Sequence, residues 1–257
     1  MSNLMIAPED KTVTRSELDS FTAGILKAHT HSHKPRPFAD VVNMAQDELE
    51  RIGFHIGSEQ YVLARNNTQL FAMLEIVNFK DGEQSRLSYA IRTSMNKTLS
   101  ESHALAETIV ACTNLCLWAK QSMATKNTRF IDTRVRTMVR EYVSRVTGLV
   151  EEHAERKTMY KTTLINETYA ALAIKRMYES DVINTQRIGA VIDQYNCPTH
   201  AEHLGPNGEH TSWTLFNAVT EAFKGSPIST YAERCDGLHD VIGNATHAAR
   251  ERGMIIA

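Results

Sequence analysis

Three short runs of β-branched, aromatic and aliphatic residues, separated by turn-forming residues, constrain the fold of this chain more than any other feature. The runs cover Gln60–Ala64, Gln69–Asn78 and Leu87–Arg92. Four polar residues, Arg65–Thr68, separate the first two runs, and the stretch Phe79–Glu83 before the third contains Asp-Gly, a dipeptide that favours tight reversals. Runs joined by such short connections pair antiparallel, so the sequence predicts consecutive hairpins of one sheet.

Helical periodicity is present on both sides of this β-rich part. Apolar residues from Phe38 to Ile52 recur at helical spacing before Gly53, which predicts one early helix. From about Arg129 to the C-terminus the apolar residues again follow helical spacing, as in the stripe from Val135 to Val150. Residues 102–121 fit either one or two further strands or a helix. The expected fold is therefore α+β: an antiparallel β-sheet with an early helix, followed by a mostly α-helical second half.

The chain divides into three parts by these patterns. Residues 1–37 lack sustained periodicity and end in Pro35-Arg36-Pro37, where two prolines disfavour a helix, so we expect an irregular leader. Residues 38–121 hold the sheet and residues 122–257 hold most of the helices. The two parts are expected to pack together as one domain.

Composition places the chain among ordinary globular proteins. A hydrophobic content of 42% supports a substantial core, and no apolar run approaches the ~18 residues that cross a bilayer. The N-terminal stretch MSNLMIAPEDK has neither a basic leader nor a cleavable apolar segment, so we expect a cytoplasmic location and no membrane partner. The four cysteines are too sparse for a disulfide framework, and we expect reduced thiols.

Four stretches occur in an order that is similar to a known family. They are RTSMNK (Arg92–Lys97), CTNLC (Cys112–Cys116), YNCPTH (Tyr195–His200) and WTLFNAVTE (Trp213–Glu221). Together they resemble the phage- and plasmid-borne family known as domain of unknown function 932, from Pro35 to Leu238. The resemblance implies a mobile genetic element in a bacterial host cell and carries no settled activity. Where that family tends to have Pro-x-Pro-His and Cys-Asp-Asn-Leu, this chain has Pro35-Arg36-Pro37-Phe38 and Cys112-Thr113-Asn114-Leu115.

Positive charge is concentrated in the middle of the chain. Between Lys120 and Arg176 there are 12 Lys and Arg against 6 Asp and Glu, a local charge of +6, whereas the whole chain carries −2. Such a segment is typical of contact with a sugar-phosphate backbone, although arginines that border an apolar helix stripe also serve as a solvated rim over the core. The residues expected to bind nucleic acid are Arg92, Lys97, Lys120, Lys126, Arg129, Arg136 and Arg140.

Clustered histidines suggest a second chemistry. The candidate metal ligands are His29 and His33 of the stretch HTHSH, with Cys197, His200 and His203 of the stretch CPTHAEH. A zinc enzyme needs about three protein ligands and an open position, and the sequence shows no pattern such as His-Glu-x-x-His. Histidine-rich polar loops are therefore the favoured interpretation, and we expect no cofactor, with zinc or another divalent metal as the open alternative.

The remaining motifs disfavour several enzyme classes. The sequence contains no glycine-rich nucleotide loop and no Gly-x-Ser-x-Gly elbow, and no catalytic residue stands out. Asn114 and Asn217 are expected to be structural polar anchors. The favoured function is non-enzymatic nucleic-acid binding by a phage or plasmid protein, as in single-strand binding or annealing during replication or recombination. Two alternatives stay open: an interaction protein that modulates a host or defence complex, and a metal-dependent hydrolase or nuclease using the histidines. Among partners, a host protein and a homo-oligomer of this chain also stay open.

Overall fold

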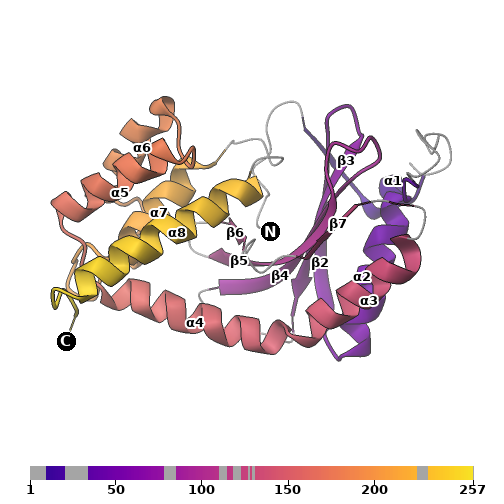
Figure 1. Cartoon of the computed structure of the whole chain (residues 1–257), viewed down its shortest axis with the longest axis horizontal. Helices are drawn as coiled ribbons and strands as arrows, with labels where there is room; N and C mark the ends of the chain where they lie inside the picture. The colour runs from indigo at the N-terminus through magenta and orange to yellow at the C-terminus, as the bar shows by residue number, and fades with distance from the viewer. Residues whose placement is uncertain are drawn as a thin grey trace.

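The computed structural model shows an antiparallel sheet with an early helix, followed by a mostly helical second half, which confirms the expected α+β fold (Figure 1). It describes residues 10–20, 34–77, 85–109, 115–117, 123–126, 128, 131–224 and 231–256. Among these residues, no helix is both long and apolar enough to span a membrane.

The strands of the described residues form one sheet of seven, in the order β1-β2-β3-β4-β5-β6, with β7 also paired to β5. Every neighbouring pair is antiparallel. The strands are β1 (Lys11–Val13), β2 (Ile56–Ala64), β3 (Gln69–Ile76), β4 (Ser85–Ser94), β5 (Glu101–Ile109), β6 (Leu115–Leu117) and β7 (Met123–Thr125). The three β-rich runs of the sequence are thus confirmed as β2, β3 and β4, each paired with the next strand along the chain.

The turn between β2 and β3 has the backbone geometry that its asparagines favour. Asn66 and Asn67 have positive φ angles of 55° and 62°, and the amide of Thr68 donates to the carbonyl of Arg65 at 3.3 Å. Positive φ at both central positions characterises type I′ hairpin turns, and asparagine tolerates this conformation better than most residues. The short polar connection therefore joins β2 directly to β3.

Periodicity left residues 102–121 undecided between strand and helix, and the structure places strands β5 (Glu101–Ile109) and β6 (Leu115–Leu117) there. In β5, Glu101, His103 and Leu105 are buried, whereas Ser102 and Ala104 are partly exposed. This period of two belongs to a strand that buries one face. The sequence concealed it because two of the buried positions are Glu and His, residues that ordinarily face solvent.

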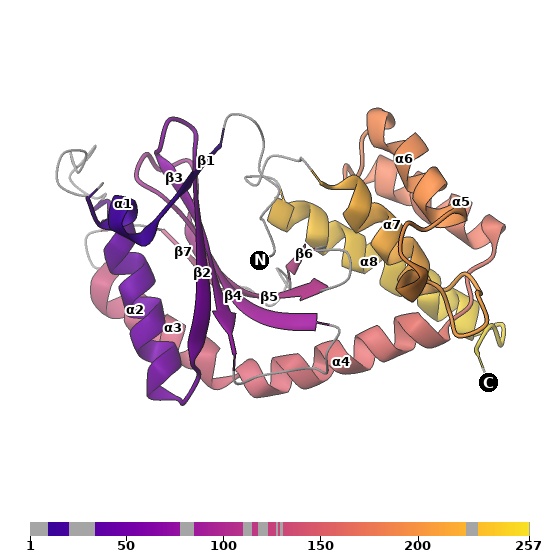
Figure 2. The same cartoon turned by 180° about the vertical axis from the view of Figure 1, so that it is seen from behind.

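Two groups of helices lie on opposite sides of the sheet (Figures 1 and 2). α2 and α3 cover one face, the other group holds α5 to α8, and α4 runs between them. The helices are α1 (Arg15–Ser20), α2 (Phe38–Arg51), α3 (Ile131–Ser144), α4 (Val146–Thr162), α5 (Glu167–Glu179), α6 (Thr185–Asn196), the 3₁₀ turn η2 (Ala201–His203), α7 (Ser212–Ala222) and α8 (Tyr231–Arg250). Buried apolar side chains of both groups belong to one continuous core.

The apolar stripe predicted from Val135 to Val150 is largely buried, but it is shared by two helices. Val135, Val139 and Tyr142 belong to α3, and Leu149 and Val150 belong to α4. Arg145 interrupts the helical hydrogen bonding between them. Because the stripe continues across the break, α3 and α4 together line the same core.

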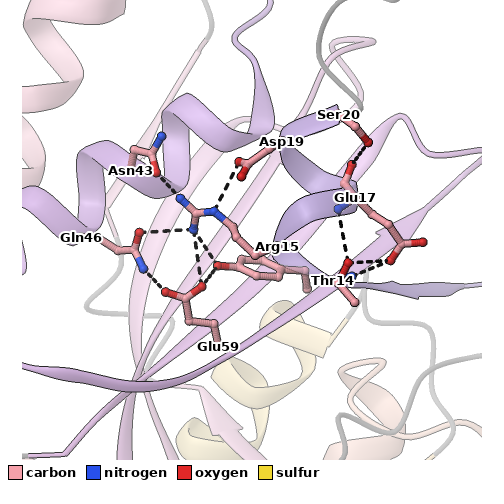
Figure 3. A network of polar contacts seen from close by, with 9 residues as sticks. Thr14, Arg15, Glu17, Asp19, Ser20, Asn43, Gln46 and Glu59 are labelled. Carbon is pink, nitrogen blue, oxygen red and sulfur yellow. Dashed lines mark hydrogen bonds and ion pairs between the residues drawn. The ribbon is translucent and has the colours of Figure 1, made fainter.

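The expectation of an irregular leader over residues 1–37 is wrong for residues 11–13 and 15–20, which form β1 and α1. Val13 and Leu18 are buried in the core. The guanidinium of Arg15 anchors α1 to α2 and β2 (Figure 3). Its partners are Asp19, Asn43, Gln46, Glu59 and Tyr61. Elements of three and six residues are too short to show periodicity in the sequence, so tertiary contacts define them.

Candidate nucleic-acid interface

Three exposed cations lie in one row at the end of the sheet where β2, β4 and β7 finish. Arg65 is in the turn after β2, Lys97 is in the turn after β4, and Lys126 directly follows β7. The strand register aligns these positions. The last residue of β2 pairs with the first of β3, the first of β3 with the last of β4, and the first of β5 with the last of β7. We call this surface, defined by Arg65, Lys97 and Lys126, the basic end.

Side-chain hydrogen bonds join the two turns of the basic end. Asn96 Nδ2 donates to Thr68 Oγ1 at 2.9 Å, and Gln69 Nε2 donates to Thr98 Oγ1 at 2.8 Å. Each bond links the β2–β3 connection to the β4–β5 connection. The relative position of the two turns is therefore held by specific contacts rather than by the strands alone.

The stretch RTSMNK is the end of β4 and the turn that presents Lys97. Ser94 Oγ donates to the carbonyl of Leu99 at 3.0 Å and accepts from the amide of Leu99 at 2.9 Å, which closes the turn. Lys97 has a φ angle of 68°, a left-handed conformation that residues other than glycine seldom adopt. Such backbone conformations persist where surrounding contacts hold them, and they concentrate at functional sites.

A buried ion pair lies beneath the basic end. Arg36 Nη1 donates to both carboxylate oxygens of Glu101, at 2.8 and 3.0 Å, and the two side chains are 7% and 0% exposed. His103 Nε2 lies 3.2 Å from the same carboxylate. Burial raises the pKa of Glu101, but contacts with His103 and Arg36 outweigh it and leave the pKa below its ordinary value. Glu101 is the only acidic residue in segments 64–69, 94–101 and 123–126, so the exposed charges of these segments are positive.

Two helices begin close in the chain to residues of this end. α2 starts at Phe38, two residues after Arg36, and α3 starts at Ile131, five residues after Lys126. The N-terminus of an α-helix carries partial positive charge and unpaired backbone amides. Each of these helix N-termini therefore carries charge of the same sign as the cations of the basic end.

Arg136 and Arg140 come together as expected, but they bind carboxylates of α2. Arg140 donates from Nε and Nη2 to Glu48 at 3.1 and 3.0 Å, Arg136 Nη1 lies at 3.3 Å, and Arg51 Nε lies at 2.8 Å. Arg136 also lies 3.6 Å from Asp47. Glu48 is 1% exposed, whereas the three arginines are about half exposed. This Glu48 cluster joins α3 to α2, and its two carboxylates offset most of the arginine charge.

The Glu48 cluster makes stability depend on pH. Hydrogen bonds from Arg140 and Arg51 outweigh burial and lower the pKa of Glu48 from 4.5 to about 2. Because the carboxyl pKa is lower in the folded protein than in the unfolded chain, the ionised Glu48 stabilises the fold fully above about pH 4.5. This stabilisation is lost as the pH falls toward 2. We expect this loss to be about 2 kcal/mol, because solvent screens the half-exposed guanidinium groups. Urea unfolding of the wild type and Glu48→Gln across this range measures it, and equal pH slopes for the two proteins would contradict the assignment.

The other cations predicted from the sequence lie elsewhere. Arg92 Nη1 binds Glu233 Oε1 of α8 at 2.7 Å, so it joins the sheet to the second helix group. Lys120 and Arg129 lie outside the described residues. Of the predicted cations, the structure thus brings Lys97 and Lys126 to the basic end and Arg136 and Arg140 to the Glu48 cluster.

The candidate metal ligands do not form a site of three among the described residues. His29 and His33 lie outside those residues, and Cys197 is exposed after α6. The imidazoles of His200 and His203 are neighbours, with ring centroids 5.2 Å apart. Burial, with a smaller effect of His200, lowers the pKa of His203 to about 4, so this imidazole is neutral at pH 7.

The two expected polar anchors have different outcomes. Asn114 lies outside the described residues. Asn217 is fully buried in α7, and its Nδ2 donates to the carbonyl of Trp213 at 2.8 Å. Its side chain thus hydrogen-bonds within its own helix, one turn back.

Three residues of this region were not predicted from the sequence: Arg65, Arg36 and Glu101. Arg65 was hidden because only the asparagines after it carry the turn signal. Arg36 was assigned to an irregular leader, and Glu101 looked like a surface residue. A buried Arg–Glu pair separated by 65 positions leaves no local pattern, so only the folded chain reveals it.

No family model, curated protein or solved structure matches this chain. The resemblance to domain of unknown function 932 therefore stays a prediction.

Proposed function

We propose that this chain is a non-enzymatic nucleic-acid-binding protein of a phage or plasmid, and that the basic end contacts the sugar-phosphate backbone. The observation that carries the proposal is the row of Arg65, Lys97 and Lys126, three exposed cations from separate connections of one sheet. Phosphate contacts by Lys and Arg supply most of the sequence-independent affinity of such proteins.

The spacing of the row suits a single strand. From β2 to β7 the row crosses five neighbouring strands of the sheet, and strands ~4.8 Å apart give a span of roughly 19 Å. At the ~3.4 Å rise per nucleotide of one nucleic-acid strand, this span corresponds to about five or six nucleotides. Segments 64–69, 94–101 and 123–126 contain no aromatic residue to stack on bases. We therefore expect backbone contact without base preference, as single-strand binding or annealing requires.

The test removes the three charges together. We expect Arg65→Gln with Lys97→Gln and Lys126→Gln to weaken binding of a labelled 20-nucleotide single strand by roughly 100-fold near 0.1 M salt, and to reduce the salt slope by about 2, since each phosphate contact contributes ~0.7. Fluorescence anisotropy across a salt series measures both quantities. A matched duplex, titrated in parallel, reports the strand preference.

A charge-matched control separates the site from net charge. Lys175, Arg176 and Arg252 are also exposed but lie on α5 and just after α8, so replacing them with Gln should leave the affinity within about twofold. Equal losses in the two triple variants would mean that total charge, and not the basic end, drives binding. A wild-type protein that binds neither single strands nor duplex at low salt would refute the proposal.

A further inference from the structure

Three polar atoms between η2 and α7 are buried and have no hydrogen-bond partner. They are His203 Nε2, Asn217 Oδ1 and Glu221 Oε2. The side chains of His203 and Asn217 are 2% and 0% exposed, and that of Glu221 is 19% exposed. Buried polar atoms are nearly always paired in folded proteins. Three such atoms on two neighbouring elements therefore make a candidate ligand site.

The geometry of α7 brings these atoms together. Thr214, Asn217 and Glu221 follow one another at spacings of three and four residues, so they share one face of the helix. His203 lies along this face, because its carbonyl accepts from Thr214 Oγ1 at 2.6 Å and its imidazole interacts electrostatically with Glu221. Asn217 lies between Thr214 and Glu221 on that face. The three side chains therefore lie along one face of α7.

We propose that these three side chains converge on a divalent transition-metal ion, which His203 Nε2, Asn217 Oδ1 and Glu221 Oε2 would bind. Imidazole nitrogen and carboxylate oxygen are ordinary ligands of zinc and related ions, and amide oxygens also bind divalent cations. His203 and Glu221 belong to the residue types that most often bind metal ions, and the amide oxygen of Asn217 supplies the third ligand. This ligand set shares only His203 with the ligands suggested by the sequence, and it does not depend on the proposed nucleic-acid binding.

The neighbouring Lys224 makes the proposal testable in two directions. Lys224 Nζ binds Glu221 Oε1, which leaves Oε2 for the ion while the ammonium charge opposes it. Removing that charge should therefore tighten metal binding. Asn217→Asp should also tighten it, because a carboxylate replaces a neutral amide of the same shape. A polar site that holds only water would show neither gain.

The experiment uses the full chain without an affinity tag, in a background where His29, His31 and His33 are replaced by Gln so that the HTHSH stretch does not capture metal. Zinc is titrated against a chromophoric chelator, and metal content is measured by mass spectrometry after dialysis. We expect one zinc per chain, affinity weakened roughly 10- to 100-fold or more in His203→Gln and Glu221→Gln, and tightened in Asn217→Asp and Lys224→Gln.

His210→Gln is the matched control, because this histidine packs on Tyr195, with ring centroids 4.7 Å apart, and is not part of the proposed ligand set. It should leave zinc affinity unchanged. The two gain-of-affinity variants keep the test decisive if His203→Gln fails to fold, which circular dichroism reports. Absence of stoichiometric zinc in the background without His29, His31 and His33, or affinities that Asn217→Asp and Lys224→Gln do not raise, would overturn the proposal.

Discussion

Replacing Glu101 with glutamine is expected to lower the free energy of unfolding by about 3–5 kcal/mol. The Glu101 side chain is 0% exposed, and it accepts two hydrogen bonds from Arg36, which is 7% exposed. Glutamine preserves the shape of the side chain but removes its negative charge, so the buried guanidinium of Arg36 loses the carboxylate that accepts two of its hydrogen bonds. Urea unfolding followed by circular dichroism measures the loss.

Two comparisons define the cause of that loss. Glu179→Gln removes one carboxylate from the exposed ion pair with Lys175 and should cost less than about 0.5 kcal/mol. The double variant Arg36→Met with Glu101→Gln should recover most of the stability, since it removes both buried charges. If Glu101→Gln alone costs less than about 1 kcal/mol, the buried pair does not hold the start of α2 against β5.

Phe216→Ala is expected to cost about 3–5 kcal/mol, the usual effect of removing a buried aromatic side chain. Phe216 is 2% exposed in α7. Its ring lies 5.5 Å from Trp213, 5.9 Å from Tyr160 and 5.1 Å from His239, measured between centroids. Alanine leaves a cavity that these rings only partly fill.

This substitution also tests whether the two helix groups and the sheet unfold together. Because their buried side chains form one continuous core, we expect a single transition at a lower urea concentration. Tryptophan fluorescence and circular dichroism should then change together. Leu172→Ala is the control, since that side chain is 53% exposed and should change stability by less than about 0.5 kcal/mol. Two separated transitions would mean that the helical part forms an independent unit.

The candidate site was only partly predictable from residue types. Lys97 and Lys126 are expected from charge alone, and the structure brings them to the same end of the sheet. Arg136 and Arg140 carry the same charge, yet they bind a carboxylate of α2 that is nearly 90 positions away in the chain. Local sequence shows that a cation is present, whereas its distance to the nearest carboxylate depends on which helices pack together.

The amino-acid sequence by itself determined the order of strands and helices, because β-rich runs, turn asparagines and helical stripes act within a few residues of one another. Only the tertiary structure decided the short elements β1 and α1, the strand β5, and the pairing of Arg36 with Glu101. Each of these depends on burial against residues distant in the chain, and a charged side chain becomes a buried partner only when its counter-charge is brought to it.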